Sequence, residues 1–482
     1  MNNRTKARAL RFLSNVTLIV GVLQFLAMHS NAQEADSIVP SAHFSNVDFE
    51  APALDKEFHA KKREDLRAIM PENSAAIIFS SSIKNRSNDV DFEFHQDPNF
   101  FYLTGLNEPH AMLIVFKEEQ RVESFDSKEI LFIQPRDSMK EIWSGKTLGV
   151  DKAKELLGLK YVFASGMFTE FDFDFYKFDK VFYIVDHTSI TDDDKNRRDL
   201  FSLKKHFVQM LDSTRKNVDL QMLKEFMATL REIKEPEEIA LLRKAIEITC
   251  GAQHDLIAKL KPGMYEYQAE AIIEFGFKFQ GAESPGFPSI IGGGKNSCIL
   301  HYTSNRNELQ DGELLVIDIG AEYHNYSADI TRTLPINGKF TKEQKIIYNI
   351  VLDAQNAGIE ACKKGNKFWA PNEASTKIII QGLVQNGVIK KRMDYRKYFM
   401  HGTSHYLGLD VHDIGLNGSL APGNVLTVEP GIYIPKGSDC DPKWWNIGIR
   451  IEDDILITKD GYEVLSDCVP KTITEIEYLM AK

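Results

Sequence analysis

The sequence is poor in cysteine and has no excess of positive charge, and each deficit excludes a class of function. Its five cysteines form no C-x-x-C pair, which excludes a structural zinc site built on paired thiolates. The formal net charge is −11, so there is no basic excess to displace counterions from nucleic acid. The chain also lacks internal repeats and low-complexity tracts, which leaves an ordinary globular protein.

The cysteines offer two interpretations. They lie far apart in the second half of the chain, and their odd number leaves at least one thiol free. We expect buried, small apolar side chains, with one disulfide as the alternative in an exported protein. The five positions are Cys250, Cys298, Cys362, Cys440 and Cys468.

Long apolar runs are absent except near the N-terminus. Four basic residues in MNNRTKARALR precede the apolar segment FLSNVTLIVGVLQFLAM, and small residues follow it. This order predicts a signal peptide over residues 1–32, and hence an exported protein, periplasmic or secreted, with no membrane span after cleavage. The alternative is an uncleaved membrane anchor, which the polar Ser14, Asn15 and Gln24 disfavour.

The rest of the chain divides by its patterns. A polar lead-in covers 33–55, an α/β domain with strands such as SAAIIF and KVFYIV covers 56–215, and a linker helix covers 216–235. The region 236–482 combines helices expected at 341–364 and 371–386 with Gly-punctuated strands. This order predicts an α+β domain, an antiparallel sheet covered by helices, with a site in the concavity of the sheet.

Carboxylates interrupt apolar, strand-like runs at four places. Asp318 lies in GELLVIDIG, Asp329 in YSADITRTL, Glu429 at the end of NVLTVEP, and Glu452 in GIRIEDDILIT. Buried carboxylates need compensating positive charge. Four such groups balance two divalent cations, which predicts a metal-assisted hydrolase. A hairpin around 322–325 would bring the first two together.

Histidines and one arginine extend this set. His401, His405 and His412 lie within twelve positions, and His301 in CILHYTSN is a fourth candidate. Arg450 and Glu452 are expected on one strand face, with Arg450 holding the carboxylates in place. Ligation by oxygens with one or two imidazoles favours Mn²⁺, with Zn²⁺ or Co²⁺ possible.

The stretches ILHYTSN, DIG…ADITRT, HGTSHYLGLDVHD, LTVEPGIYI and GIRIEDD together resemble the aminopeptidase P (Xaa-Pro aminopeptidase) group of the M24B metallopeptidases. In addition, NFFYLTGLNEP resembles the non-catalytic N-terminal domain of that group, and KEPEEIALLRKAIEIT the start of its catalytic domain. The resemblance implies an α/β N-terminal domain plus an α+β "pita-bread" (creatinase/aminopeptidase-like) catalytic domain.

The resemblance also implies roles for individual residues. The metal ligands would be Asp318, Asp329, His405, Glu429 and Glu452, with Asp329 and Glu452 bridging two ions, usually Mn²⁺. His301, His401 and His412, with Tyr433, would bind substrate; the three histidines and Glu429 would take part in catalysis. We expect a metal-bridged hydroxide to cleave the bond that precedes a penultimate proline. We also expect the chain to form a homo-oligomer.

Two alternatives remain open. A prolidase would use the same site on Xaa-Pro dipeptides alone. A metal-free binding protein on the same fold would need no ligand set, and the intact ligand positions disfavour it.

Overall fold

The computed structural model describes residues 54–185, 198–211 and 216–481. The predicted signal peptide and nearly all of the lead-in lie outside these residues, so both stay predictions. Among the described residues, no helix combines the length and the apolar character that a bilayer crossing requires.

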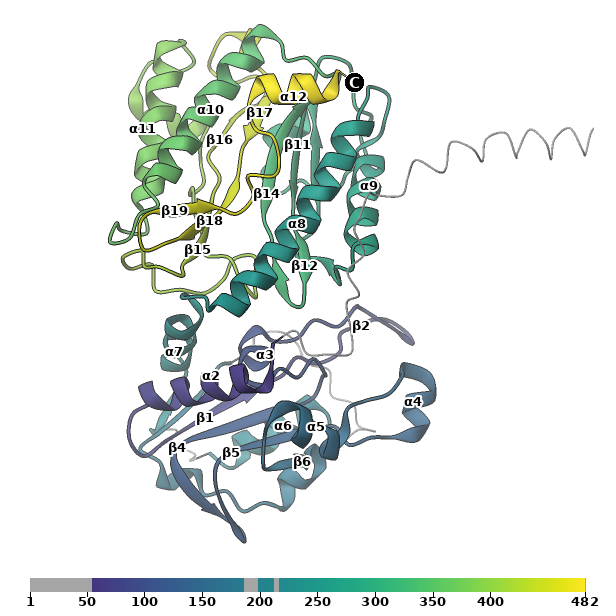
Figure 1. The fold of residues 1–482 in the computed structure, drawn as a ribbon, viewed down its shortest axis with the longest axis vertical. Coiled ribbons are helices and arrows are strands. Elements are labelled where there is room, and N and C mark those ends of the chain that lie inside the picture. Colours follow the sequence, from purple (N-terminus) through teal and green to yellow (C-terminus); the bar gives the residue numbers. More distant parts are fainter. Residues whose placement is uncertain (1–53, 186–197, 212–215, 482) are drawn as a thin grey trace, which may run out of the picture. The chain divides into compact units, whose positions relative to one another are not determined.

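The N-terminal domain is built on one mixed sheet of six strands in the order β6-β5-β4-β1-β7-β8 (Figure 1). Its strands are β1 (Ser74–Phe79), β4 (Met112–Val122), β5 (Phe125–Ile133), β6 (Val162–Ala164), β7 (Lys180–Tyr183) and β8 (Val218–Asp219), with a separate β2–β3 hairpin (Asn85–Ser87, Val90–Asp91). The strand β1 is antiparallel to β4 and parallel to β7. The predicted strands are therefore confirmed.

Helices surround this sheet. They are α2 (Lys56–Ile69), α3 (Pro98–Thr104), α4 (Ser138–Ser144), α5 (Gly149–Leu157) and α6 (Leu200–Gln209). The short α3 begins after Asp97, whose carboxylate accepts a hydrogen bond from Phe100 N at 2.8 Å, and Pro98 occupies the first turn. Its aromatic residues are buried, as core residues are.

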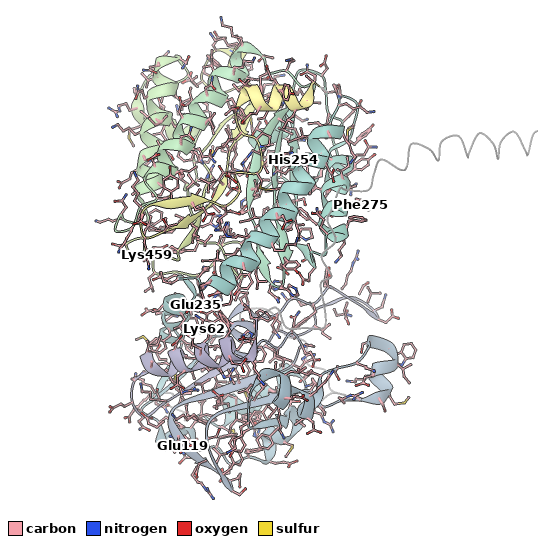
Figure 2. All side chains as sticks on the ribbon, viewed as in Figure 1. Lys62, Glu119, Glu235, His254, Phe275 and Lys459 are labelled. Carbon is pink, nitrogen blue, oxygen red and sulfur yellow. A yellow bond between two sulfur atoms is a disulfide. The ribbon has the colours of Figure 1, made fainter. Side chains whose placement is uncertain are left out.

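The linker region contains one further helix, α7 (Met222–Arg231), before α8 begins at Pro236. The long α8 (Pro236–Lys259) has a capping box between Glu235 and Glu238, which explains why the chain turns sharply here. Lys62 of α2 pairs with Glu235 at 3.1 Å, and both residues are labelled in Figure 2. The predicted linker over 216–235 stays a prediction. The break between α7 and α8, at residues 232–235, falls inside this range.

The second half of the chain contains short antiparallel sheets between two groups of helices (Figure 1). The strands are β9 (Ser284–Pro285), β10 (Ile290–Gly293), β11 (Leu314–Ile319), β12 (Ala321–Tyr323), β13 (Tyr326–Ser327), β14 (Ile330–Pro335), β15 (Val425–Val428), β16 (Gly431–Ile434), β17 (Ile447–Arg450), β18 (Asp453–Ile457) and β19 (Tyr462–Val464). The helices are α9 (Glu266–Phe279), α10 (Lys342–Glu360), α11 (Ala370–Gln385) and α12 (Ile473–Met480).

The helices contact different strands. The helices α8 and α9 contact β10, β12 and β13, whereas α10 contacts β15, β16 and β17 and packs on α11. Thr341 caps α10 through a capping box with Gln344, so the predicted helix start is confirmed. This arrangement confirms the predicted antiparallel sheet covered by helices.

Two of the cysteines are bonded to each other. The structure joins Cys250 of α8 to Cys468 in a disulfide across a Cα–Cα distance of 6.1 Å. The expectation of free, small apolar side chains is therefore wrong for this pair, because residues 218 positions apart meet only in the folded chain. It holds for Cys362, which is free and buried.

Candidate metal and peptide site

The predicted site residues come together around one cavity of about 600 Å³. Four carboxylates, four histidines and one arginine line it: Asp318, Asp329, Glu429, Glu452, His301, His401, His405, His412 and Arg450. Phe287, Pro288, Ile290, Leu300 and Val411 form an apolar wall beside them. The cavity therefore combines a strongly acidic part with an apolar part.

A break in two paired strands directs two of these carboxylates into the cavity. The pair β15–β18 ends at Val428 and Asp453, and the pair β16–β17 begins at Gly431 and Arg450. Between the pairs, Pro430 has no N–H to continue a ladder, so the chain changes sheets there. Glu429 and Glu452 occupy the two sides of this bend. The expectation that Arg450 and Glu452 lie on one strand face is therefore wrong, because β17 ends at Arg450 and Glu452 lies in the bend. Both side chains nevertheless line the cavity.

The other two carboxylates come from the predicted hairpin. Asp318 on β11 lies opposite Thr331 on β14, and Asp329 directly precedes β14. The turn uses His324 and Asn325 with φ of 49° and 66°, the left-handed conformation that Asn adopts more readily than most residues. The predicted convergence of Asp318 and Asp329 on the cavity is therefore confirmed.

The carboxylates are underpaired for their burial. Asp329 and Glu452 are 5% and 1% exposed, and the Oδ1 atoms of Asp318 and Asp329 have no hydrogen-bond partner. Burial, reinforced by the repulsion of neighbouring carboxylates, raises the pKa of Asp329 and of Glu452 well above the usual range. Burial also raises the pKa of Glu429 to about 7. Buried carboxylates of this kind are stabilised by a bound cation.

His405 has the tautomer that a metal ligand needs. Its Nδ1 lies 3.0 Å from the carbonyl oxygen of Tyr406, which can only accept a hydrogen bond, so Nδ1 carries the proton. With Nδ1 as a donor, Nε2 is directed at Asp329 Oδ2 at 3.4 Å and at Glu429 Oε1 at 3.8 Å. It can therefore bind an ion together with these carboxylates, while the carbonyl of Tyr406 fixes the orientation of the ring.

Three potential ligand atoms lie close enough together to form the core of a metal site. Asp329, His405 and Glu452 each offer an atom, all within 4.8 Å of one another. Asp318 instead accepts a hydrogen bond from Arg450 Nη2 at 2.6 Å. The donor set, oxygen-rich with one imidazole, fits a divalent cation of the Mn²⁺ or Zn²⁺ type.

A hydrogen-bonded chain orients His401. The carbonyl of Gly402 accepts from His401 Nδ1 at 2.7 Å, so Nε2 accepts from the Tyr433 hydroxyl at 2.9 Å. That hydroxyl accepts in turn from Arg450 Nη1 at 2.9 Å. Burial and, to a smaller extent, the positive charge of Arg450 lower the pKa of His401 to about 4, which keeps the ring neutral. Tyr433 is fully buried and does not line the cavity.

Two positioning residues carry no strong sequence signal. The Thr331 hydroxyl donates to Glu452 Oε2 at 2.6 Å and accepts from Arg450 Nε at 3.2 Å. Glu266 of α9 is fully buried and accepts from Gly293 N, Asn296 Nδ2, Tyr302 Oη and Asn307 N at 2.8–2.9 Å. It therefore fixes the segment that carries His301. Every residue of β14 is buried, so its sequence pattern does not reveal the partners of Thr331.

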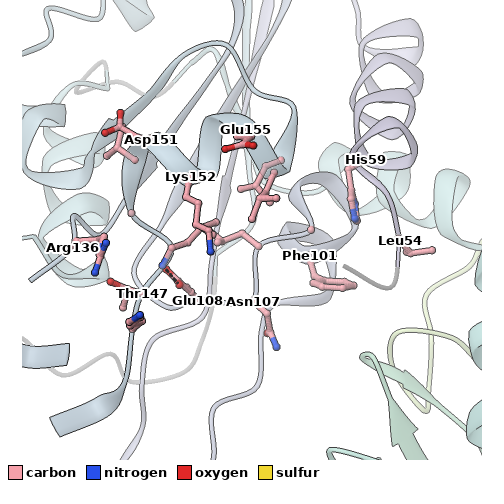
Figure 3. Close-up of a pocket in the computed structure, with 18 of the residues that line it drawn as sticks. Leu54, His59, Phe101, Asn107, Glu108, Arg136, Thr147, Asp151, Lys152 and Glu155 are labelled. Atoms are coloured by element: carbon pink, nitrogen blue, oxygen red, sulfur yellow. Dashed lines mark hydrogen bonds between the residues drawn. The ribbon is translucent and has the colours of Figure 1, made fainter. Parts of the chain in front are cut away.

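A larger cavity than the one just described lies elsewhere. It measures about 1190 Å³, and Glu108, Arg136, Thr147 and Lys152 are among its lining residues (Figure 3). His59 also borders it, but its Nδ1 bonds to the carbonyl of Tyr102 at 3.0 Å. No group of metal-ligating side chains converges there within the described residues. Its size alone gives it no catalytic chemistry.

Comparison with known proteins matches both halves of the chain. The model of metallopeptidase family M24 matches residues 240–459, and the model of the aminopeptidase P N-terminal domain matches 59–182. The Xaa-Pro aminopeptidase of Escherichia coli K12 is 39% identical over 443 residues, covering 89% of this chain and 98% of the relative.

Solved structures agree. The E. coli aminopeptidase P structure with the inhibitor Pro-Leu has a TM-score of 0.80 at 36% identity, covering 89% of this chain and 98% of the other. A zinc-substituted form of the E. coli enzyme, in complex with product, has a TM-score of 0.79 at 36% identity and the same coverage.

Proposed function

Because the chain belongs to metallopeptidase family M24 and carries the N-terminal domain of aminopeptidase P, we propose that it is an Xaa-Pro aminopeptidase. It would hydrolyse the bond between an N-terminal residue and a penultimate proline. The expected fold, an α/β domain followed by a pita-bread catalytic domain, is confirmed. One observation supports the activity most: underpaired buried carboxylates and the Nε2 atom of His405 converge in a cavity with an apolar wall.

Membership of this family implies divalent metal ions, and the residues present fit them. Asp329, His405 and Glu452 would hold one ion, and Asp318 and Glu429 would complete a site for a second after small side-chain shifts. We assign two ions because four carboxylates balance two doubly positive charges, and Mn²⁺ because oxygen ligands predominate. When bound, such a pair lowers the pKa of a shared water and supplies hydroxide near neutral pH.

The chain's own residues divide the remaining work. Glu429, whose Oε1 lies 3.8 Å from His405 Nε2 inside the cavity, would carry the proton of the attacking water to the prolyl nitrogen. His412 is exposed, and its ring has no hydrogen bond within the described part of the chain, so it is available to the developing oxyanion. His401 has both nitrogens engaged, which favours substrate packing over proton transfer.

The apolar wall supports a preference for proline. Proline has a fixed φ and no N–H to donate, so a site shaped around its ring loses no hydrogen bond to it. Leu300 and Val411 flank His301 and His412, which places apolar surface beside the groups expected to meet the scissile bond. The ring of His301, exposed on its loop, would close the other side of the proline.

The decisive experiment compares matched peptides on protein loaded with Mn²⁺. We expect Xaa-Pro-Yaa to be cleaved at least about 100-fold faster than Xaa-Ala-Yaa, measured as kcat/KM by release of the N-terminal amino acid. A peptide acetylated at its N-terminus should resist cleavage. Equal turnover of the alanine peptide would contradict the proline preference, and cleavage of Xaa-Pro dipeptides alone would favour a prolidase.

Export is proposed from the N-terminal sequence alone. The signal peptide would be cleaved after Ala32, which would leave a mature chain without a membrane span outside the cytoplasm. We also propose that the mature chain forms a homo-oligomer. The Cys250–Cys468 disulfide is in keeping with an oxidising compartment. N-terminal sequencing of the mature protein should begin at Gln33; an intact Met1 on membrane-bound protein would instead indicate an anchor.

A further inference from the structure

A buried cluster of charged side chains is centred on Asp413, the residue that follows His412 in the sequence. Asp413 has a side chain that is 1% exposed and pairs with two cations. Its Oδ1 accepts from Arg231 Nη2, and its Oδ2 accepts from Lys234 Nζ at 2.8 Å. The two cations lower the pKa of Asp413 despite its burial, so the carboxylate stays charged. An ionised group this deep is tolerated only with its partners in place.

Both cations come from the linker between the domains. Arg231 is the last residue of α7 and Lys234 lies just before α8; they are 1% and 4% exposed. Arg231 Nη1 also donates to Asn99 Oδ1 at 2.7 Å, on α3 of the N-terminal domain. Its Nη2 reaches Asp410 at 3.1 Å, within the same loop as Asp413. One guanidinium therefore joins the N-terminal domain to the loop that carries His412.

Further contacts hold the linker against the N-terminal domain. The Tyr102 hydroxyl of α3 donates to the carbonyl of Leu230 at 2.8 Å. Lys62 of α2 pairs with Glu235 at the start of α8 (Figure 2). The position of Arg231 is consequently set from the N-terminal side as well as from the catalytic side.

The loop from Tyr406 to Asp413 transmits this position to His412. Asp413 N donates to the carbonyl of Tyr406 at 2.9 Å, which closes the loop, and the His412 ring lies 4.2 Å from the His405 ring, edge to face. Because the His412 ring has no hydrogen bond of its own in the described chain, its place depends on the backbone that Asp413 anchors. Gly408 leaves room for this anchor, since a Cβ there would collide with Asp413 Oδ2.

We propose that Arg231, with Lys234 and Asn99, positions His412 through Asp413, so that the linker and the N-terminal domain are a working part of the catalytic site. These are positioning residues, since none lines the cavity that holds the reacting groups. The proposal rests on the proposed function, because it assigns these residues to the step that His412 assists.

The experiment uses full-length protein loaded with Mn²⁺ and an Xaa-Pro-Yaa peptide. Arg231→Met should lower kcat by about 100-fold, the cost of a misplacement near 1 Å, with metal content and KM changed by less than about threefold. In a His412→Ala background, the same substitution should lower kcat by less than about twofold, because the group that it positions is gone.

Two further variants make the outcome decisive. Arg63→Met is a matched control: Arg63 is equally buried, pairs with Glu129 at 3.0 Å inside the N-terminal domain, and should cost thermal stability but leave kcat near wild type. Asn99→Ala removes only the outer hydrogen bond of Arg231 and replaces Arg231→Met if that variant does not fold. It should lower kcat by about fivefold, again only when His412 is present.

Equal losses in both backgrounds, loss of bound metal, or full kcat in a folded Arg231→Met protein would each overturn the proposal. These results differ from failure of the proposed function, in which the wild-type protein itself would not cleave the proline peptide.

Discussion

Replacing Asp329 with alanine is expected to reduce kcat/KM for Xaa-Pro-Yaa peptides by at least about a thousandfold, or about 4 kcal/mol of transition-state stabilisation. Asp329 belongs to the three-residue cluster that can hold an ion, and its Oδ2 lies 3.4 Å from His405 Nε2. Without it, neither charge balance nor ligand number supports metal binding. Metal content measured by elemental analysis should fall together with activity.

The same substitution should stabilise the metal-free protein. Asp329 is buried among other carboxylates and has an unpartnered Oδ1, so its removal relieves repulsion and a desolvation cost. We expect a higher Tm for metal-free Asp329→Ala than for metal-free wild type.

A matched control comes from the same hairpin. Glu322 is also buried, pairs with His95 at 3.0 Å and lies outside the cavity. Glu322→Gln should therefore keep metal and activity. Near-normal turnover by folded Asp329→Ala would contradict its assignment as a metal ligand.

Removing divalent metal is expected to abolish activity and to make the stability of the protein strongly dependent on pH. Without metal, the pKa values of Asp329, Glu429 and Glu452 are raised, that of Glu429 to about 7. The folded protein then binds these protons more tightly than the unfolded chain does. Its free energy of unfolding therefore falls as the pH rises from about 4 through 7.

The magnitude of this effect is measurable. For Glu429 alone, a change from 4.5 to about 7 corresponds to about 3 kcal/mol. Thermal unfolding of chelator-treated protein between pH 5 and 8 should show a falling Tm, and added Mn²⁺ should restore it most at the alkaline end. A Tm that is independent of pH and metal over this range would contradict a cation site formed by these carboxylates.

Local chemistry made much of the site predictable from the sequence. Carboxylates inside apolar strands are costly wherever the strands pair, so Asp318, Asp329, Glu429 and Glu452 could be recognised as a set before their positions were known. The same reasoning identified Arg450 as their partner, and its guanidinium donates a hydrogen bond to Asp318. The helix start at Thr341 depends on residues three positions apart, which the sequence displays directly.

Other features could not be predicted, because they depend on residues far apart in the chain. The bend that separates Arg450 from Glu452 arises where two strand pairs exchange sheets, and periodicity within a strand does not reveal it. The hydrogen bonds of Tyr433 could not be predicted for the same reason: its hydroxyl lies between His401 and Arg450, which are far from it in the sequence.

The sequence by itself determined the class of chemistry, since the types and order of the acidic and imidazole groups favour binding of divalent cations. Only the tertiary structure decided which nitrogen of His405 faces the carboxylates, which cysteines meet, and that Arg231 connects the N-terminal domain to Asp413. Each of these is a hydrogen bond, a disulfide or an ion pair between groups brought together by folding, and the energy of such contacts depends on distances that sequence spacing does not contain.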